Sequence, residues 1–180
     1  MPLTPEAKAL LARTIRGTQA SGDGSLRERL VSGIAAAAEG YYRLGVGVRE
    51  ARLDDPRRKK RERLETWLDE RARASGATGR ELKAARDRAL TEAVKLSGAT
   101  FLNRVVLLRQ LEAFGLQKPA VVTGAWASAG YRAFRDFAPA LCTDETDGYG
   151  ALLALVFDEL AVDLPGVFGD VGVTRLLPVP

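Results

Sequence analysis

The chain has 180 residues, of which 46% are hydrophobic and 28% charged, a balance typical of one soluble domain that builds its core without disulfides or metals. A single cysteine and the absence of histidine exclude an intrachain disulfide, a zinc site of the usual ligands, a Ser-His-Asp triad and a Cys-His dyad. The sequence contains no apolar run of about 18 residues and no basic-then-apolar signal pattern at its start. We therefore expect a cytoplasmic protein without membrane contact. Abundant Ala, Leu and Arg favour a mainly α fold, an irregular multi-helix domain with few or no strands.

Charge is distributed unevenly behind the net value of +4. Between Arg49 and Lys95 there are 15 Lys or Arg against 10 Asp or Glu, whereas eight acids accompany the single Arg175 from Asp136 to Pro180. Basic surfaces attract nucleic acid phosphates and acidic surfaces repel them. The sequence thus predicts one basic side, suited to DNA, and one acidic side.

The first 47 residues predict two helices followed by a loop. Thr4, placed before a proline, has the character of an N-cap that opens the first helix. Ser25, three residues before a glutamate, forms a capping box for the second helix, which we expect to close at Gly40. Aromatic, aliphatic and glycine residues alternate over 41–47, a pattern that favours a loop with aromatic anchors.

A basic helix is predicted next, with Asp55 as its N-cap and Gly76 as its end. Positive charge at a helix N-terminus opposes the helix dipole, and a phosphate backbone would supply the compensating anion. A solvated helix face with Trp67 packed inward is the simpler explanation of the same residues, and DNA contact is the alternative that stays open. The candidate DNA-backbone residues are Arg57, Arg58, Lys59, Lys60, Arg61 and Arg63.

One long helix is expected to dominate the fold, at about residues 79–114. Thr78 with Glu81 forms a second capping box at its start, and Gly115 supplies a left-handed stop. Because Gly98 costs only about 1 kcal/mol inside a helix, the element is either one rod of about 35 residues or a helix kinked at that glycine.

Four polar side chains lie among the apolar residues of this long helix. Arg109 and Glu112 are three residues apart and can pair along the helix. Polar groups that are buried without partners cost several kcal/mol, so we expect a partnered polar network within the fold. Its candidate members are Asn103, Arg104, Arg109 and Glu112.

The remaining residues, 116–180, form an acidic and apolar C-terminal part. Residues 118–124 are expected to form a short strand or an extended link. An aromatic-edged helix is predicted to end before Pro139, and an acidic turn at 143–148 precedes a strongly apolar helix. The tail over 167–180 is rich in apolar residues for which we expect no partner within the chain.

Two sequence blocks in this half resemble a known family. The run ATFLNRVVLLRQLEAFGL, residues 99–116, resembles the helix just upstream of the catalytic domain in large adenine-specific DNA methyltransferases. The run FAPALCTDETDGYGALLALVFDELAVDLPGVFGDVGVTRLLPVP, residues 137–180, resembles the continuation of that region. The family comprises type IIG restriction-modification enzymes and the methyltransferases of the BREX (PglX) and DISARM phage-defence systems.

The resemblance implies a supporting domain rather than an active enzyme. In the family, this region precedes an S-adenosylmethionine-binding catalytic domain and a target-recognition part. The chain lacks the Asn-Pro-Pro-Tyr-like loop and the glycine-rich strand-to-helix turn that methyl transfer to adenine requires. We therefore expect no catalytic, cofactor-binding or metal-binding residue here, with S-adenosylmethionine bound only in the parent protein. The resemblance assigns the four polar residues of the long helix to the fold or to the junction with the catalytic domain.

The resulting hypothesis is a single helical N-terminal domain, 1–180, belonging to a larger DNA methyltransferase. It divides into N-terminal helices and loop (1–47), the basic and long helices (55–115) and the acidic part (116–180). Its expected partners are a downstream methyltransferase domain or subunit, DNA and other defence-system proteins. The alternative is a stand-alone nucleic-acid-binding or protein-interaction module.

Overall fold

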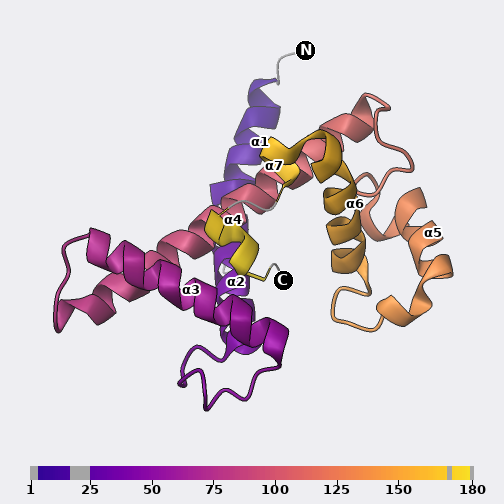
Figure 1. Cartoon of the computed structure of the whole chain (residues 1–180). Coiled ribbons are helices and arrows are strands. Elements are labelled where there is room, and N and C mark those ends of the chain that lie inside the picture. Colours follow the sequence, from indigo (N-terminus) through magenta and orange to yellow (C-terminus); the bar gives the residue numbers. More distant parts are fainter. Residues whose placement is uncertain (1–3, 17–24, 170–171, 179–180) are drawn as a thin grey trace. The chain divides into compact units, whose positions relative to one another are not determined.

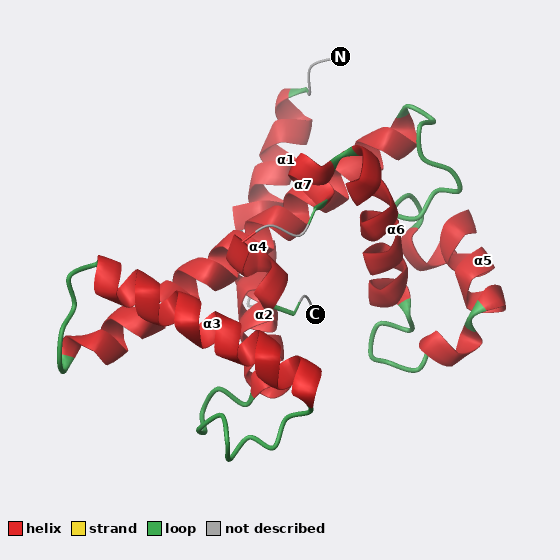
Figure 2. Cartoon of the chain, in the orientation of Figure 1, coloured by secondary structure: helices red, strands yellow, loops and turns green. Residues whose placement is uncertain are grey.

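The computed structural model describes residues 4–16, 25–169 and 172–178, and the prediction of a mainly α fold is confirmed (Figure 1). Helices account for 73% of the structure, and the described residues contain no strand (Figure 2). Residues 118–124, expected to form a strand or a link, therefore form an irregular link.

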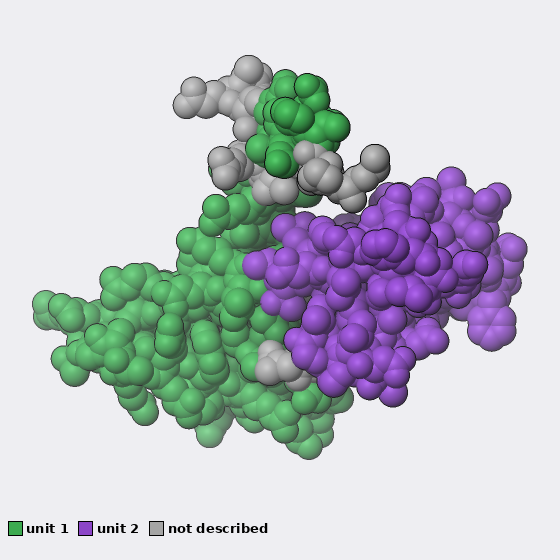
Figure 3. Space-filling model, turned by 90° about the horizontal axis from the view of Figure 1, so that it is seen from above, with its two compact units in different colours: residues 1–98, 172–180 green, residues 99–171 purple. Residues whose placement is uncertain are grey.

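The chain is divided into two compact units, each with its own hydrophobic core (Figure 3). Unit 1 contains residues 1–98 and 172–180, and unit 2 contains residues 99–171. The long helix α4 (Glu81–Ala113) contributes its first half to unit 1 and its second half to unit 2. A single domain within a longer protein stays a prediction.

The first two helices begin where their capping residues predict. Helix α1 spans Pro5–Arg16, and the Thr4 hydroxyl accepts a hydrogen bond from the Ala7 N–H at 3.2 Å. Helix α2 spans Leu26–Tyr42, and Ser25 forms the predicted reciprocal capping box. Both caps satisfy backbone donors that would otherwise lack partners.

The prediction that α2 closes at Gly40 is wrong, because the helix continues for two more residues. Tyr42 is almost fully buried, and its hydroxyl donates to the carbonyl of Leu176. Arg43 then ends the helix in the left-handed conformation, at φ 53°. The burial of the Tyr42 ring therefore stabilises a helical turn that the glycine alone would have ended.

Helix α3 spans Asp55–Ala74, so it begins one residue earlier than the predicted N-cap at Asp55 requires. Asp54, not Asp55, is the N-cap, and its carboxylate accepts from the Arg57 N–H at 2.9 Å. The buried face of α3 follows helical spacing and consists of Arg61, Leu64, Leu68 and Ala72.

The long helix is confirmed as one continuous element, although it begins two residues later than the predicted capping box requires. Gly79 adopts φ 55°, a left-handed value that no helical residue has, so the helix starts only at Glu81. Gly98 lies inside the helix, where an added Cβ would stand 3.4 Å from Leu30 and 3.5 Å from Ile34. The glycine thus admits side chains of α2 close to the α4 backbone.

The core of unit 1 combines three helices with the end of the chain. Val173 and Leu177 are buried in it, and the 3₁₀ turn Gly172–Leu176 packs against α3 (Figure 1). The expectation that the apolar tail lacks a partner is therefore wrong for these residues. The other buried members are Ile34, Ala38, Tyr42, Leu64, Leu68, Ala89, Ala93 and Val94.

Unit 2 is built from the second half of α4 together with α5 (Ala129–Phe137), α6 (Tyr149–Asp163) and the short α7 (Pro165–Phe168). The carboxylates of the acidic turn do not cap α6, although the Thr146 hydroxyl accepts a hydrogen bond from the Gly150 N–H at 3.1 Å. Instead, Asp144 accepts from the N–H groups of Thr146 and Gly148 and so closes the turn on itself. The buried core residues are Leu108, Val121, Tyr131, Leu152, Leu153, Val156, Phe157 and Phe168.

Candidate nucleic-acid interface

The first turns of α3 present most of the candidate DNA-backbone residues to solvent. The Arg57 guanidinium lies 3.3 Å from Asp54 and 4.8 Å from the centre of the Tyr41 ring. Arg58 pairs with Asp55 at 2.6 Å. Such exposed ion pairs contribute at most about 1 kcal/mol, so a polyanion can compete for these guanidinium groups. The exposed candidates are Arg57, Arg58, Lys59, Lys60 and Arg63.

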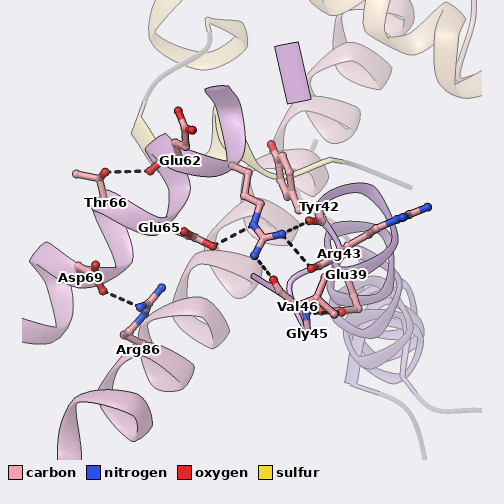
Figure 4. Close-up of polar contacts among 11 residues, drawn as sticks. Glu39, Tyr42, Arg43, Gly45, Val46, Glu62, Glu65, Thr66, Asp69 and Arg86 are labelled. Carbon is pink, nitrogen blue, oxygen red and sulfur yellow. Dashed lines mark hydrogen bonds and ion pairs between the residues drawn. The ribbon is translucent and has the colours of Figure 1, made fainter. Parts of the chain in front are cut away.

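Arg61 is the exception, because only 2% of its surface is exposed. Its guanidinium donates to the carbonyl oxygens of Tyr42 at 2.8 Å, Arg43 at 3.0 Å and Val46 at 2.5 Å. Its Nε donates to Glu65 at 3.0 Å (Figure 4). A buried charge persists only when it is paired and hydrogen-bonded, and these four bonds meet that need. Arg61 therefore holds the fold of unit 1 and is not available to a DNA phosphate.

Two of the carbonyls that Arg61 binds, those of Arg43 and Val46, belong to the start of a loop, residues 43–54, that joins α2 to α3. The Gly45 N–H donates to the Glu39 carboxylate at 2.9 Å (Figure 4). Arg43 donates from its guanidinium to the Ala51 carbonyl at 3.3 Å. Ala51 is fully buried. The loop is thus fastened at its beginning by Arg61 and near its end by Arg43.

Two arginines of this loop join the basic surface, although the sequence analysis did not select them. Arg49 and Arg52 line a hollow of about 510 Å³ together with Arg58 and Glu62 of α3. The signal that could have found them is the N-cap, because a loop that enters a helix at Asp54 must lie close to the first turns of that helix.

In unit 2, two of the four predicted network residues, Arg104 and Glu112, form hydrogen bonds, and their partners are groups of distant segments. The Glu112 carboxylate accepts hydrogen bonds from the N–H groups of Val121, Val122 and Thr123 at 2.6, 2.7 and 2.8 Å, and from the Thr123 hydroxyl at 2.6 Å. Partial burial raises the pKa of Glu112, but these four hydrogen bonds outweigh burial and leave the pKa below its ordinary value. Within the described residues, Glu112 forms no ion pair with Arg109, so the predicted pairing is wrong.

Arg104 fastens a second segment to α4. Its guanidinium donates to the carbonyls of Val167 at 3.0 Å and Gly169 at 2.8 Å and lies 5.8 Å from the centre of the Phe157 ring. Asn103 and Arg109 are exposed, so only Arg104 and Glu112 of the four predicted residues join distant segments. Arg104 and Glu112 each hold a distant backbone segment against α4.

Several large apolar side chains of unit 2 are exposed. Single exposed apolar residues are common on protein surfaces, whereas exposed apolar residues that lie together mark an interaction surface. These side chains come from the segment just after α4, from the last residue of α5 and from α6. They are Phe137, Val162, Phe114 and Leu116, with exposures of 90, 81, 78 and 73%.

Among the described residues, no group of three or more His, Cys, Asp or Glu side chains is placed to hold a metal ion. None of the helices in the described part of the chain combines the length and apolarity needed to cross a bilayer. Comparison with protein-family models, with curated proteins and with solved structures found no significant match. Any functional assignment therefore depends on the residues of the chain itself.

Proposed function

We propose that the chain is the non-catalytic N-terminal helical domain of a DNA adenine methyltransferase from a restriction-modification or phage-defence system of the BREX or DISARM kind. The observation that carries the proposal is that the first block resembling this family, 99–116, and most of the second, 137–169, belong to one compact unit, while the end of the second block, 172–178, belongs to unit 1. Arg104 of the first block donates two hydrogen bonds to backbone carbonyls of the second. The rings of Phe101 and Phe157 meet edge to face, with centroids 6.2 Å apart.

In this role the chain supports chemistry that the parent protein performs. The catalytic domain of the parent would bind S-adenosylmethionine and the flipped adenine. The exposed apolar side chains of unit 2 would be covered by that domain, while the exposed basic turns of α3 would contact the DNA backbone. Other defence-system proteins are further partners of the assembled enzyme.

The proposal is tested through the catalytic partner. The reading frame beyond Pro180 and the neighbouring genes should encode a polypeptide with an Asn-Pro-Pro-Tyr-like loop. That polypeptide and the present chain, produced separately, should associate when mixed in a calorimeter. Replacing Phe137 and Val162 by serine should weaken association at least tenfold, whereas the matched change of Leu10 and Leu96, which are exposed in unit 1, should not.

Two results would overturn this function. One is the absence of any such polypeptide, or a partner that does not associate with the folded chain. The other is methyl transfer to DNA by this chain alone, because the proposed domain has no catalytic residues.

A stand-alone nucleic-acid-binding module is the second candidate, favoured by the exposed basic turns of α3. It predicts salt-dependent DNA binding together with a genomic neighbourhood that contains no methyltransferase. A protein-interaction module for another defence protein predicts no DNA affinity. The two measurements, partner association and DNA binding, therefore distinguish the candidates.

A further inference from the structure

The arginines in and beside the loop between α2 and α3 are of two kinds: some bind backbone carbonyls inside the fold, and others face solvent. Arg43 uses its guanidinium to bind the Ala51 carbonyl, and the buried Arg61 binds three carbonyls at the start of the loop. Arg49 and Arg52 are exposed, and neither forms an ion pair with any residue that the structure describes. Two cations of the loop are therefore left facing solvent.

We propose that Arg49, Arg52 and Arg58 form a binding site for a backbone phosphate of duplex DNA. These three side chains line one hollow, in which the only carboxylate is that of Glu62. Arginine donates several N–H groups in a rigid plane that matches the geometry of phosphate oxygens. Arg58 already pairs with Asp55, but that pair is exposed and weak enough for a phosphate to replace it.

The structure holds this site in place before any ligand binds. The hydrogen bonds from Arg61 and Arg43 fix both parts of the loop, so binding does not need to order the backbone. Arg52 adopts φ 47°, a left-handed conformation that is unfavourable for any residue with a β-carbon. Such backbone strain is retained where the surrounding structure holds the residue in one conformation. Here that residue is Arg52, which lines the hollow.

The positive charge around the hollow fits a polyanion better than a free phosphate ion. Lys59, Lys60 and Arg63 are exposed and continue the positive charge along α3 beyond the hollow. A single phosphate would use only the hollow, whereas a nucleic acid strand would use both. This inference rests on the DNA contact in the proposed function and adds Arg49 and Arg52 to it.

The test compares two charge-matched double variants of the full chain. Binding of a labelled DNA duplex is measured by fluorescence anisotropy over a range of salt concentrations for the wild type, for Arg49→Gln/Arg52→Gln and for Arg73→Gln/Arg80→Gln. Arg73 and Arg80 are also exposed and belong to the same unit, so the second variant loses the same charge elsewhere. Loss of this one phosphate contact should lower the slope of log affinity against log salt by about 0.9, and the control should keep the wild-type slope.

Equal slopes for the two variants would overturn the site. Tighter binding of an RNA duplex, or binding of inorganic phosphate without affinity for DNA, would overturn its assignment to DNA. Association with the methyltransferase polypeptide is measured separately with the same variants. If that association persists while the two variants have equal salt slopes for DNA, the phosphate site is wrong and the proposed function stands. If association fails while the two salt slopes differ, the proposed function is wrong and the phosphate site stands.

Discussion

Replacement of the buried Arg61 by methionine should destabilise unit 1 strongly. Methionine replaces the aliphatic stem of arginine with an unbranched apolar chain of similar length and removes the guanidinium with every hydrogen-bond donor that it carries. The carbonyls of Tyr42, Arg43 and Val46 would then lose their partner, and Glu65 would lose its counter-ion. The same change at Arg63, two residues further along α3 and exposed, is the matched control.

The expected loss is about 3–5 kcal/mol of unfolding free energy. The bond to the Tyr42 carbonyl is fully buried, and leaving such a group unpaired costs about 1–3 kcal/mol. The bonds to Arg43 and Val46 are only partly buried, so water can replace them at a lower cost. The Glu65 side chain is 27% exposed and can be partly hydrated, which keeps the total near the middle of the range. The exposed Arg63→Met change should cost no more than about 0.5 kcal/mol.

The assay is urea unfolding followed by tryptophan fluorescence. Trp67 packs against the core of unit 1, whereas Trp126 belongs to unit 2 and is 55% exposed. In a Trp126→Phe background, Trp67 reports on unit 1 alone, which matters because two units need not unfold in one transition. Equal midpoints for Arg61→Met and Arg63→Met would refute the reasoning.

Three further predictions concern unit 2. Glu112→Gln should destabilise it, because folding lowers the pKa of the wild-type carboxyl group. The wild-type carboxylate therefore stabilises the unit above its ordinary pKa of 4.5, and this stability is lost as the pH falls through the pKa of the folded state. An acid titration followed by Trp126 fluorescence measures the loss. Tyr131, whose hydroxyl donates to Asp147, has a pKa raised to about 12, so Asp147→Asn should move its ionisation towards 10 in an ultraviolet absorbance titration. Gly130→Ala should cost about 1–3 kcal/mol in thermal unfolding, because the added Cβ would lie 2.8 Å from the Ala120 carbonyl oxygen.

Each of these changes has a control or a decisive contrary result. Glu159→Gln alters an exposed carboxylate of the same unit and should leave the acid titration unchanged. An Asp147→Asn variant whose tyrosine titration matched that of the wild type would contradict the assigned hydrogen bond. Gly166→Ala adds the same methyl group where no atom lies within 4 Å, so equal losses at both glycines would refute the steric argument.

The helices were predictable because their signals are local. N-cap residues, apolar spacing and glycine stops act within a few residues, and they correctly located α1, α2 and the long α4. The ends were less predictable, since distant contacts decide them. Tyr42 extends α2 because its ring is buried and its hydroxyl meets Leu176, which lies 134 residues away in the sequence.

The partners of polar residues were the least predictable part of the candidate sites. Helical spacing made Arg109 the obvious partner of Glu112, yet three backbone N–H groups of the 121–123 segment bind that carboxylate instead. Residue spacing identifies only neighbours on the same helix, and an irregular loop leaves no periodic signal of where it will lie. Apolar surroundings selected Asn103 and Arg109 together with Arg104 and Glu112, and only the fold shows which two of the four bind distant segments.

The phase of α3 separates the basic run into two functional classes. The buried residues 61, 64, 68 and 72 follow one another in steps of three and four, so Arg61 occupies the first position of an apolar stripe. Neutralising Arg57 to Arg61 together would therefore unfold unit 1 as well as remove phosphate contacts, and lost DNA affinity would not identify the cause. Variants that keep Arg61 and change only the exposed cations measure DNA contact alone, since the folded unit that presents those cations remains intact.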